Sequence, residues 1–309
     1  MACTAIMQMR PVVYESSPKC KVFANHDAVM RFRDSKVPLL LGSDFDKIEV
    51  DKAICLNGNI YTTCNLRMNN LYSLKTTDCV MPKSIRDTTT AVRYLVKELK
   101  AIQFENALTG HKLVSVKTAE DGTRKAVFET ASEIVEAEYD AMISTIPMPA
   151  MMALTGITSN ESFACKTTYN LSVVVPFVRS KTHQTIYFPD NSTGVYRASL
   201  EGSRLILESI TPIAREDIDV VVKAFGISAK FFSYNLLNGG KENKYGKILP
   251  VDDRARKSII FELTDRFAIY SLGRFAIWKS VRTDSLINDI DIIKAMISSK
   301  YETSNRRSR

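Results

Sequence analysis

The spacing of apolar residues predicts β-strands over much of the chain. Residues 52–64, KAICLNGNIYTTC, have the pattern of strand, Asn-Gly turn and strand, and residues 111–130 repeat this pattern around an Asp-Gly turn. Residues 167–212 add four strand-like runs separated by turn residues. Apolar runs at 10–15 and 139–146 predict two short buried strands, and the second is followed at once by two prolines.

Apolar residues three and four positions apart predict helices elsewhere. These helices are expected at residues 2–9, 84–103, 149–156, 216–227 and 284–299, with a helical turn at 26–33. The second should begin at Ser84 or Asp87, and the third is opened by proline and closed by glycine. Elements of one α/β layer are thus interrupted by antiparallel strands and completed near the C-terminus. We therefore expect an α/β fold with an inserted, β-rich part.

The composition is that of a globular protein, with 45% hydrophobic and 25% charged residues among 309. No apolar run is long enough to cross a bilayer, and the first residues lack the pattern of a signal peptide. Six cysteines and three histidines are scattered without metal-ligand spacing. We expect a cytoplasmic protein with free thiols, no metal site and no membrane contact.

The formal net charge of +8 narrows the choice of partner only slightly. Much of the excess comes from local runs such as DDRARK and the C-terminal SNRRSR. A nucleic acid is a possible partner, but no RNA- or DNA-binding motif accompanies the basic residues. An anionic cofactor or small-molecule substrate explains the charge equally well. The oligomeric state is left open.

Three stretches, in this order and spacing, resemble the superfamily of FAD-dependent amine oxidases, protoporphyrinogen oxidases and UDP-galactopyranose mutases. The first is RPVVYE, residues 10–15, whose final Glu15 matches the acid that hydrogen-bonds the adenosine ribose in that family. The second is YDAMISTIP, within residues 139–149, which resembles the strand and turn beside the cofactor.

The third stretch, YSLGRFAIWKSVRTDSLINDI at residues 270–290, resembles the C-terminal Gly-Arg-aromatic motif of the mutase-like branch. The resemblance implies that Gly273 lets the backbone approach the flavin closely and that Arg274 faces phosphate or substrate oxygens. It also implies an anion-binding helix start at Asp284 and Ser285.

The same resemblance implies substrate contacts for Tyr187, Arg197 and Trp278, although a core role for Trp278 is equally consistent with the sequence. Tyr196 and Arg197 are adjacent in an expected strand. Neighbouring strand residues point to opposite faces, so the two side chains can share one cleft only across a β-bulge. An arginine that points inward from an apolar strand also needs an anionic partner.

The sequence contains no GxGxxG loop, which in the family precedes the ribose acid by about 20 residues. Counting back from Glu15 places that loop upstream of Met1. Three explanations stay open: a gene model that starts too late, a flavin-free relative, or a strand recruited from another chain.

The resemblance implies an FAD-dependent oxidoreductase-like protein that oxidises an amine or a C–H bond by flavin; it assigns no catalytic residue. A nucleotide-sugar mutase-like isomerase and a flavin-free basic scaffold are the alternatives. The expected fold class is α/β: an NAD(P)-binding, Rossmann-type FAD domain, incomplete at its N-terminus, with an inserted mixed or antiparallel β substrate domain. The FAD domain would comprise residues 1–47, 100–160 and 265–309, and the substrate domain residues 48–99 and 161–264.

Overall fold

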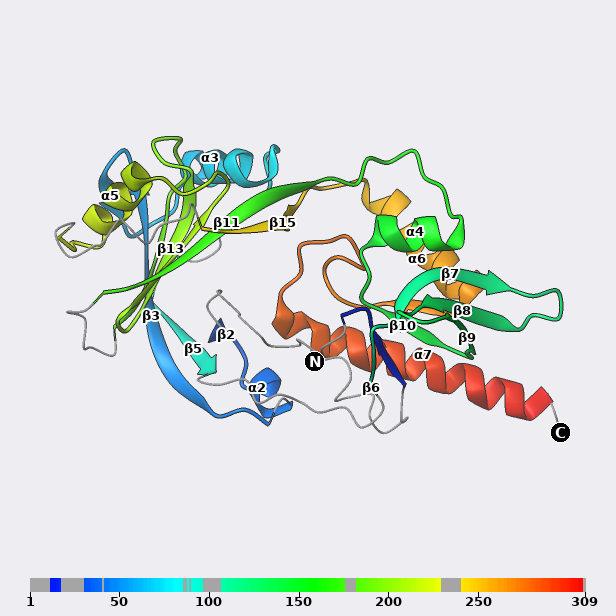
Figure 1. The fold of residues 1–309 in the computed structure, drawn as a ribbon. Coiled ribbons are helices and arrows are strands. Elements are labelled where there is room, and N and C mark those ends of the chain that lie inside the picture. Colours follow the sequence, from blue (N-terminus) through cyan, green and yellow to red (C-terminus); the bar gives the residue numbers. More distant parts are fainter. Residues whose placement is uncertain are drawn as a thin grey trace.

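The computed structural model describes residues 12–17, 31–40, 42–85, 88, 90–96, 107–175, 182–228 and 240–307, with side chains placed as far as residue 300. It shows a mixed α/β fold in which single helices separate runs of strands along the chain. A large sheet lies at one end of the molecule and a smaller α/β part at the other, joined by two long strands (Figure 1).

The large sheet contains nine strands of the described part of the chain and is almost entirely antiparallel. Its one parallel contact joins β12 to β3. In spatial order the strands are β15 (Lys241–Ile248), β11 (Cys165–Val174), β14 (Arg204–Ser209), β13 (Val195–Glu201), β12 (His183–Tyr187), β3 (Phe45–Leu56), β5 (Ala91–Val96) and β2 (Arg31–Phe32), while β4 (Asn59–Tyr61) pairs with β3. The β3–β4 hairpin confirms the predicted Asn57-Gly58 turn, and both turn residues have positive φ, as a tight hairpin requires.

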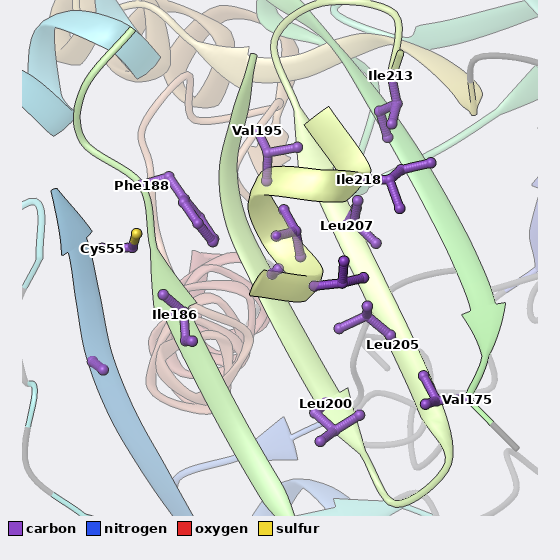
Figure 2. Packing of buried hydrophobic residues seen from close by; sticks show 14 residues of the cluster. Cys55, Val175, Ile186, Phe188, Val195, Leu200, Leu205, Leu207, Ile213 and Ile218 are labelled. Atoms are coloured by element: carbon purple, nitrogen blue, oxygen red, sulfur yellow. The ribbon is translucent and has the colours of Figure 1, made fainter. Parts of the chain in front are cut away.

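One face of this sheet is closed by helix α5 (Arg215–Ala224). Ile218, Val221 and Val222 recur at helical spacing and pack on Leu205 and Leu207 of the sheet (Figure 2). Fully burying each of these side chains contributes about 1.5–3 kcal/mol, so this contact is a principal source of the sheet's stability.

The opposite face is partly covered by helix α3 (Leu66–Thr77), which begins where the Asn65 side chain accepts a hydrogen bond from Met68 N at 2.9 Å. Met68 and Tyr72 pack on Ile54 of β3 and on Tyr196 of β13. Ile54 lies between two residues that face α5, so strand alternation places α3 on the other side of the sheet.

The smaller part combines a three-stranded antiparallel sheet with three helices. The sheet contains β7 (Lys112–Thr118), β8 (Arg124–Glu129) and β9 (Ile134–Glu138), and the turn between β7 and β8 is the predicted Asp-Gly turn. Helices α4 (Met148–Thr155) and α6 (Asp253–Phe267) pack with this sheet around Met148, Leu263 and Trp278. Helix α4 ends at Gly156 with φ +72, which confirms the predicted glycine stop.

Two short parallel strand pairs complete this part. β1 (Val13–Glu15) pairs with β6 (Ala107–Thr109), and β10 (Met142–Ser144) pairs with β16 (Ile269–Ser271). A 3₁₀ turn (Thr283–Ser285) then leads into the long helix α7 (Leu286–Arg307), which packs three isoleucines against the strand end at Tyr270 and Leu272. The remaining short helix is α2 (Lys36–Leu40).

Two helix predictions were wrong where the structure describes the chain. Residues 91–96, expected within a helix, form β5, which pairs with β3 over six residues. The run AVRYLV follows three threonines, and its β-branched and aromatic residues suit a strand once a partner is present. Residues 31–32 form β2, not a helical turn. The predicted helix at 2–9, Asp87, and residues 97–103 lie outside the described residues.

Within the described residues, no helix combines the length and the apolar character needed to cross a membrane.

Candidate functional site

Glu15 stands at the C-terminal end of β1, as predicted. Its carboxylate accepts hydrogen bonds from Ser17 N at 2.8 Å and Ser16 Oγ at 3.3 Å, and its backbone oxygen accepts one from His111 N at 3.0 Å. The acid therefore closes its own turn at the edge of the β1–β6 pair. Among the described residues, β1 pairs with β6 alone, so its other edge is free.

Gly273 ends the β10–β16 pair in the same way. Leu272 N donates to Ser144 O at 2.8 Å, which extends the pairing by one residue, and the chain then turns at Gly273 with φ +92. A Cβ atom at this position would meet no atom within 4 Å. The glycine is thus required by the backbone angle, and the space in front of it is open.

Arg274 points from this turn to the large sheet. Its Nη2 donates to the backbone oxygens of Tyr245 and Gly246 at 3.3 Å each, and its guanidinium lies 4.4 Å from the ring centroid of Phe275. These contacts bring the turn after β16 against strand β15. Arg274 therefore links the two parts of the molecule.

Asp284 and Ser285 lie in the 3₁₀ turn before α7. Asp284 Oδ1 accepts a hydrogen bond from Arg33 N at 3.1 Å, and Ser285 Oγ donates to Arg282 O at 2.7 Å. Asp284 thus ties the start of α7 to the residues that follow β2, and Ser285 closes the 3₁₀ turn itself.

A β-bulge brings Tyr196 and Arg197 to one face of the large sheet. The register between β13 and β14 shifts between Val195 and Arg197, and both Tyr196 and Arg197 then bond to one carboxylate, that of Glu208. Tyr196 OH donates to Oε1 at 3.1 Å, Arg197 Nη2 donates to Oε1 at 2.7 Å, and Arg197 Nε contacts Oε2. The bulge required by the sequence argument is present, and Glu208 is the anionic partner.

Two further tyrosines pack beside this ion pair. The Tyr72 ring of α3 meets the Tyr187 ring edge to face at 5.6 Å and the Tyr196 ring at 6.3 Å. Burial raises the pKa of Tyr72 and of Tyr196 above the ordinary value for a phenol. Both hydroxyls are therefore protonated at neutral pH, and that of Tyr196 donates its proton in the hydrogen bond to Glu208.

Lys247 completes the group from strand β15. Its Nζ lies 4.2 Å from the ring centroid of Tyr196. Burial and the charge of Arg197 lower the pKa of Lys247 to about 8, while Glu208 opposes the shift. Although burial raises the pKa of Glu208, the charge and hydrogen bonds of Arg197 outweigh it, so the Glu208 pKa lies below its ordinary value. We call Tyr72, Tyr187, Tyr196, Arg197, Glu208 and Lys247 the sheet-face cluster.

Trp278 belongs to the hydrophobic core instead. It is 2% exposed, packs with Met148 and Leu263, and meets the Phe163 ring edge to face at 5.4 Å. Its Nε1 has no hydrogen-bond partner among the described residues. The structure thus places Trp278 in the core around α4 and α6, whereas Tyr72, Tyr187 and Tyr196 pack in a separate cluster.

Sequence reasoning missed three members of the cluster. Glu208 is a lone acid in the apolar run SRLILESI, and strand alternation could have placed it on the same face as Ile206, beside Arg197. Lys247 lies in KENKYGKI, which shows no alternation of apolar residues and gave no strand prediction. Tyr72 is in α3, whose apolar residues lack a clear helical period.

A cavity of about 450 Å³ lies elsewhere, at the β7–β8 turn, and is lined by polar residues such as Asp121, Arg124 and Glu138. Across the described ranges, no three side chains of metal-binding type come together as a metal site.

The chain matches no protein-family model and no curated protein. Solved structures give weak likenesses. CtdE in complex with FAD is 11% identical over 67% of this chain and 55% of its own, with a TM-score of 0.38. HpxO of Klebsiella pneumoniae, complexed with FAD and uric acid, is 12% identical over 96% of this chain and 83% of its own, with a TM-score of 0.48.

A putative FAD-containing monooxygenase from Photorhabdus luminescens subsp. laumondii is 8% identical over 97% of this chain and 85% of its own, with a TM-score of 0.49. These neighbours are two proteins in complex with FAD and a putative FAD-containing monooxygenase, not specifically amine oxidases or mutases. Each of these TM-scores is below 0.5, so these likenesses assign no function to this chain.

Proposed function

We propose that this chain is an FAD-dependent oxidoreductase-like protein that acts on a small molecule. The observation that carries the proposal is the arrangement of the two parallel strand pairs, which end at Glu15 and at the Gly273–Arg274 turn. In open parallel α/β sheets, ligands bind beyond the carboxyl ends of the strands. An acid and an open glycine turn at these two ends suit a dinucleotide.

The residues at this edge fit parts of FAD. Glu15 would accept hydrogen bonds from the adenosine ribose, in exchange for the bonds it now accepts from its own turn. The open space in front of Gly273 would admit a ring or phosphate close to the backbone. The backbone amides near Asp284 and Ser285 would face an anionic portion. FAD, when bound, supplies the acceptor for the substrate's electrons.

We propose that the sheet-face cluster binds the substrate. Arg197 and Tyr187 lie on the sheet face that α5 does not cover, and Arg274 connects that face to the Gly273 turn. A substrate held there would lie between the sheet and the edge proposed for FAD. The reaction that we favour is oxidation of an amine or a C–H bond.

The proposed cofactor domain comprises residues 1–47, 100–160 and 265–309, and the proposed substrate domain comprises residues 48–99 and 161–264. Helix α6 falls mostly within the second set of ranges but packs with α4 and Trp278 of the first. We therefore propose to count α6 with the cofactor domain.

Titration of the purified chain with FAD, followed by quenching of flavin fluorescence, tests the proposal. Gly273→Val should weaken FAD binding by tenfold or more, because it fills the open space at the turn. Gly226→Val is the matched control: Gly226 also has positive φ and open surroundings but follows α5, so the two substitutions carry similar backbone strain. Absence of FAD binding, or equal loss in both variants, would overturn the proposal.

A further inference from the structure

The sheet-face cluster and Arg274 hold more positive than negative charge. Lys247 is close enough to Arg197 and to Arg274 to interact with both charges, and Glu208 is the one carboxylate among the described residues that interacts with all three cations. When Lys247 is protonated, three cations and one anion leave a net charge of two positive units. Such an excess in a partly buried site is unfavourable until an anion offsets it.

The hydrogen bonds of Glu208 go to residues other than Lys247. Both of its carboxylate oxygens are engaged by Arg197, and Tyr196 donates to one of them as well. Among the residues that the structure describes, Lys247 Nζ has no hydrogen-bond acceptor. It makes a cation–π contact with the face of the Tyr196 ring. A cation–π contact does not satisfy the three N–H donors of an ammonium group.

The cations can be reached by a ligand. The Arg197 side chain is 38% exposed, although Glu208 beneath it is buried. Arg274 is exposed, and its Nη2 donates to Tyr245 O and Gly246 O. Its Nε and Nη1 make no hydrogen bond to any residue that the structure describes. Donors therefore converge from β13, from β15 and from the turn after β16.

We propose that the sheet-face cluster, together with Arg274, binds a dianionic group of a small molecule, such as a phosphate monoester or a dicarboxylate. Two negative charges match the net charge of the site. This inference names the ligand class for the substrate site proposed above, but it does not depend on bound flavin. Lys247 is the residue that gains most, because the dianion supplies its missing acceptor.

Binding should also take up a proton. The pKa of Lys247 is lowered to about 8, so this amine is about half charged at pH 8. An adjacent dianion favours the charged form. At pH 8 each binding event should therefore transfer about half a proton from the buffer to the protein.

Isothermal titration calorimetry at pH 8 tests the inference on the purified full chain. The probes are inorganic phosphate and malonate, with acetate as the monoanion, each in two buffers that differ in ionisation enthalpy. We expect saturable binding of at least one dianion, at least tenfold tighter than acetate, with the proton uptake given above. The two dianions distinguish a phosphate ester from a dicarboxylate as the natural ligand class.

Three variants separate the site from general charge effects. Lys247→Gln should weaken binding about tenfold and abolish proton uptake, while Lys247→Arg should retain binding without proton uptake because arginine does not titrate near pH 8. Arg204→Gln is the control, since it removes one cation from β14 at a position where the arginine bonds to Ser172 instead. It should change neither property.

The inference is overturned if neither dianion binds better than acetate, or if Lys247→Gln binds phosphate and malonate as tightly as the wild type. FAD binding, measured separately, keeps the two proposals apart. A chain that binds FAD but no dianion loses this inference alone, and a chain that binds a dianion but no FAD loses the proposed function alone.

Discussion

Glu208 is the residue on which the sheet-face cluster depends most, and Glu208→Gln tests this directly. The substitution keeps the shape of the side chain and removes its charge. Arg197, Lys247 and Arg274 would then share one region with no carboxylate among them. The Tyr196 hydroxyl would retain an acceptor, because the amide oxygen of glutamine can replace one carboxylate oxygen.

The expected loss follows from the geometry of the ion pair. Removing one partner of a buried, hydrogen-bonded pair costs about 3–5 kcal/mol. Glu208 is 8% exposed, but the Arg197 side chain is 38% exposed and can regain water when its partner is lost. After this discount for solvent we expect Glu208→Gln to lower the free energy of unfolding by about 2–3 kcal/mol.

Urea unfolding followed by far-UV circular dichroism measures the loss. Glu262→Gln is the matched control, since Glu262 pairs with Arg266 on the exposed side of α6, where we expect less than about 0.5 kcal/mol. The fluorescence of Trp278, the only tryptophan, reports on the core between α4 and α6. We expect Glu208→Gln to disturb this core less than it disturbs the large sheet.

The difference between wild type and Glu208→Gln should also depend on pH. The Glu208 pKa is depressed in the folded chain, so its contribution is present above the ordinary glutamate value of 4.5 and is lost as the pH falls below it. Equal losses for Glu208→Gln and Glu262→Gln at pH 7 would refute the assignment of Glu208 as the counter-charge of the cluster.

Two further predictions concern lysines. Lys75 Nζ directs its three N–H groups at four backbone oxygens, those of Phe188, Asp190, Thr193 and Val195, which lie 2.6–3.0 Å away. Lys75→Met should therefore lower the free energy of unfolding in urea by about 3–5 kcal/mol. The control Lys112→Met, at an exposed ion pair, should lower it by less than about 0.5 kcal/mol. Similar losses in the two variants would contradict the role of the four backbone oxygens around Lys75. Folding lowers the pKa of Lys247 from 10.5 to about 8. Between these two pH values the amine therefore binds a proton more tightly in the unfolded chain than in the folded chain. The stability of the wild type relative to Lys247→Gln should thus rise between about pH 8 and 10.5, and a fall over this range would contradict the assignment.

The elements that sequence predicts well here are those with local signals. The Asn57-Gly58 turn and the glycine that ends α4 are set by backbone angles that few residues adopt, so their positions follow from residue type. The amphipathic spacing of Ile218, Val221 and Val222 likewise identifies α5 before any partner is known.

The elements that sequence predicts poorly depend on distant partners. β5 is a strand because β3 and β2 lie on either side of it, and this pairing overrides the helical spacing of its residues. Helix α6 begins in the charge run DDRARK, where Arg256 is buried by contacts to Asp253 and to the distant Ile277 O. Asp253 is a local partner three residues away, but the contact with Ile277 cannot be predicted from the local pattern.

The candidate site shows the same division. Arg197 and Arg274 are singled out by the resemblance to the mutase-like branch, and Arg197 also because an inward arginine in an apolar strand needs an anionic partner. Strand alternation indicates the face of Glu208, but the bulge at Tyr196 determines that Tyr196 and Arg197 both reach it, and the pairing of β11 with β15 brings in Lys247. Local sequence predicts neither the bulge nor that strand pairing.

The most direct test of the proposed function is the visible absorption spectrum of the purified chain after incubation with FAD and removal of free flavin. FAD binding at the strand ends of Glu15 and Gly273, as proposed, predicts an equimolar flavin spectrum that stays with the protein, and its loss in Gly273→Val but not in Gly226→Val. A colourless protein after the same treatment would contradict the assignment of this chain as an FAD-dependent oxidoreductase-like protein.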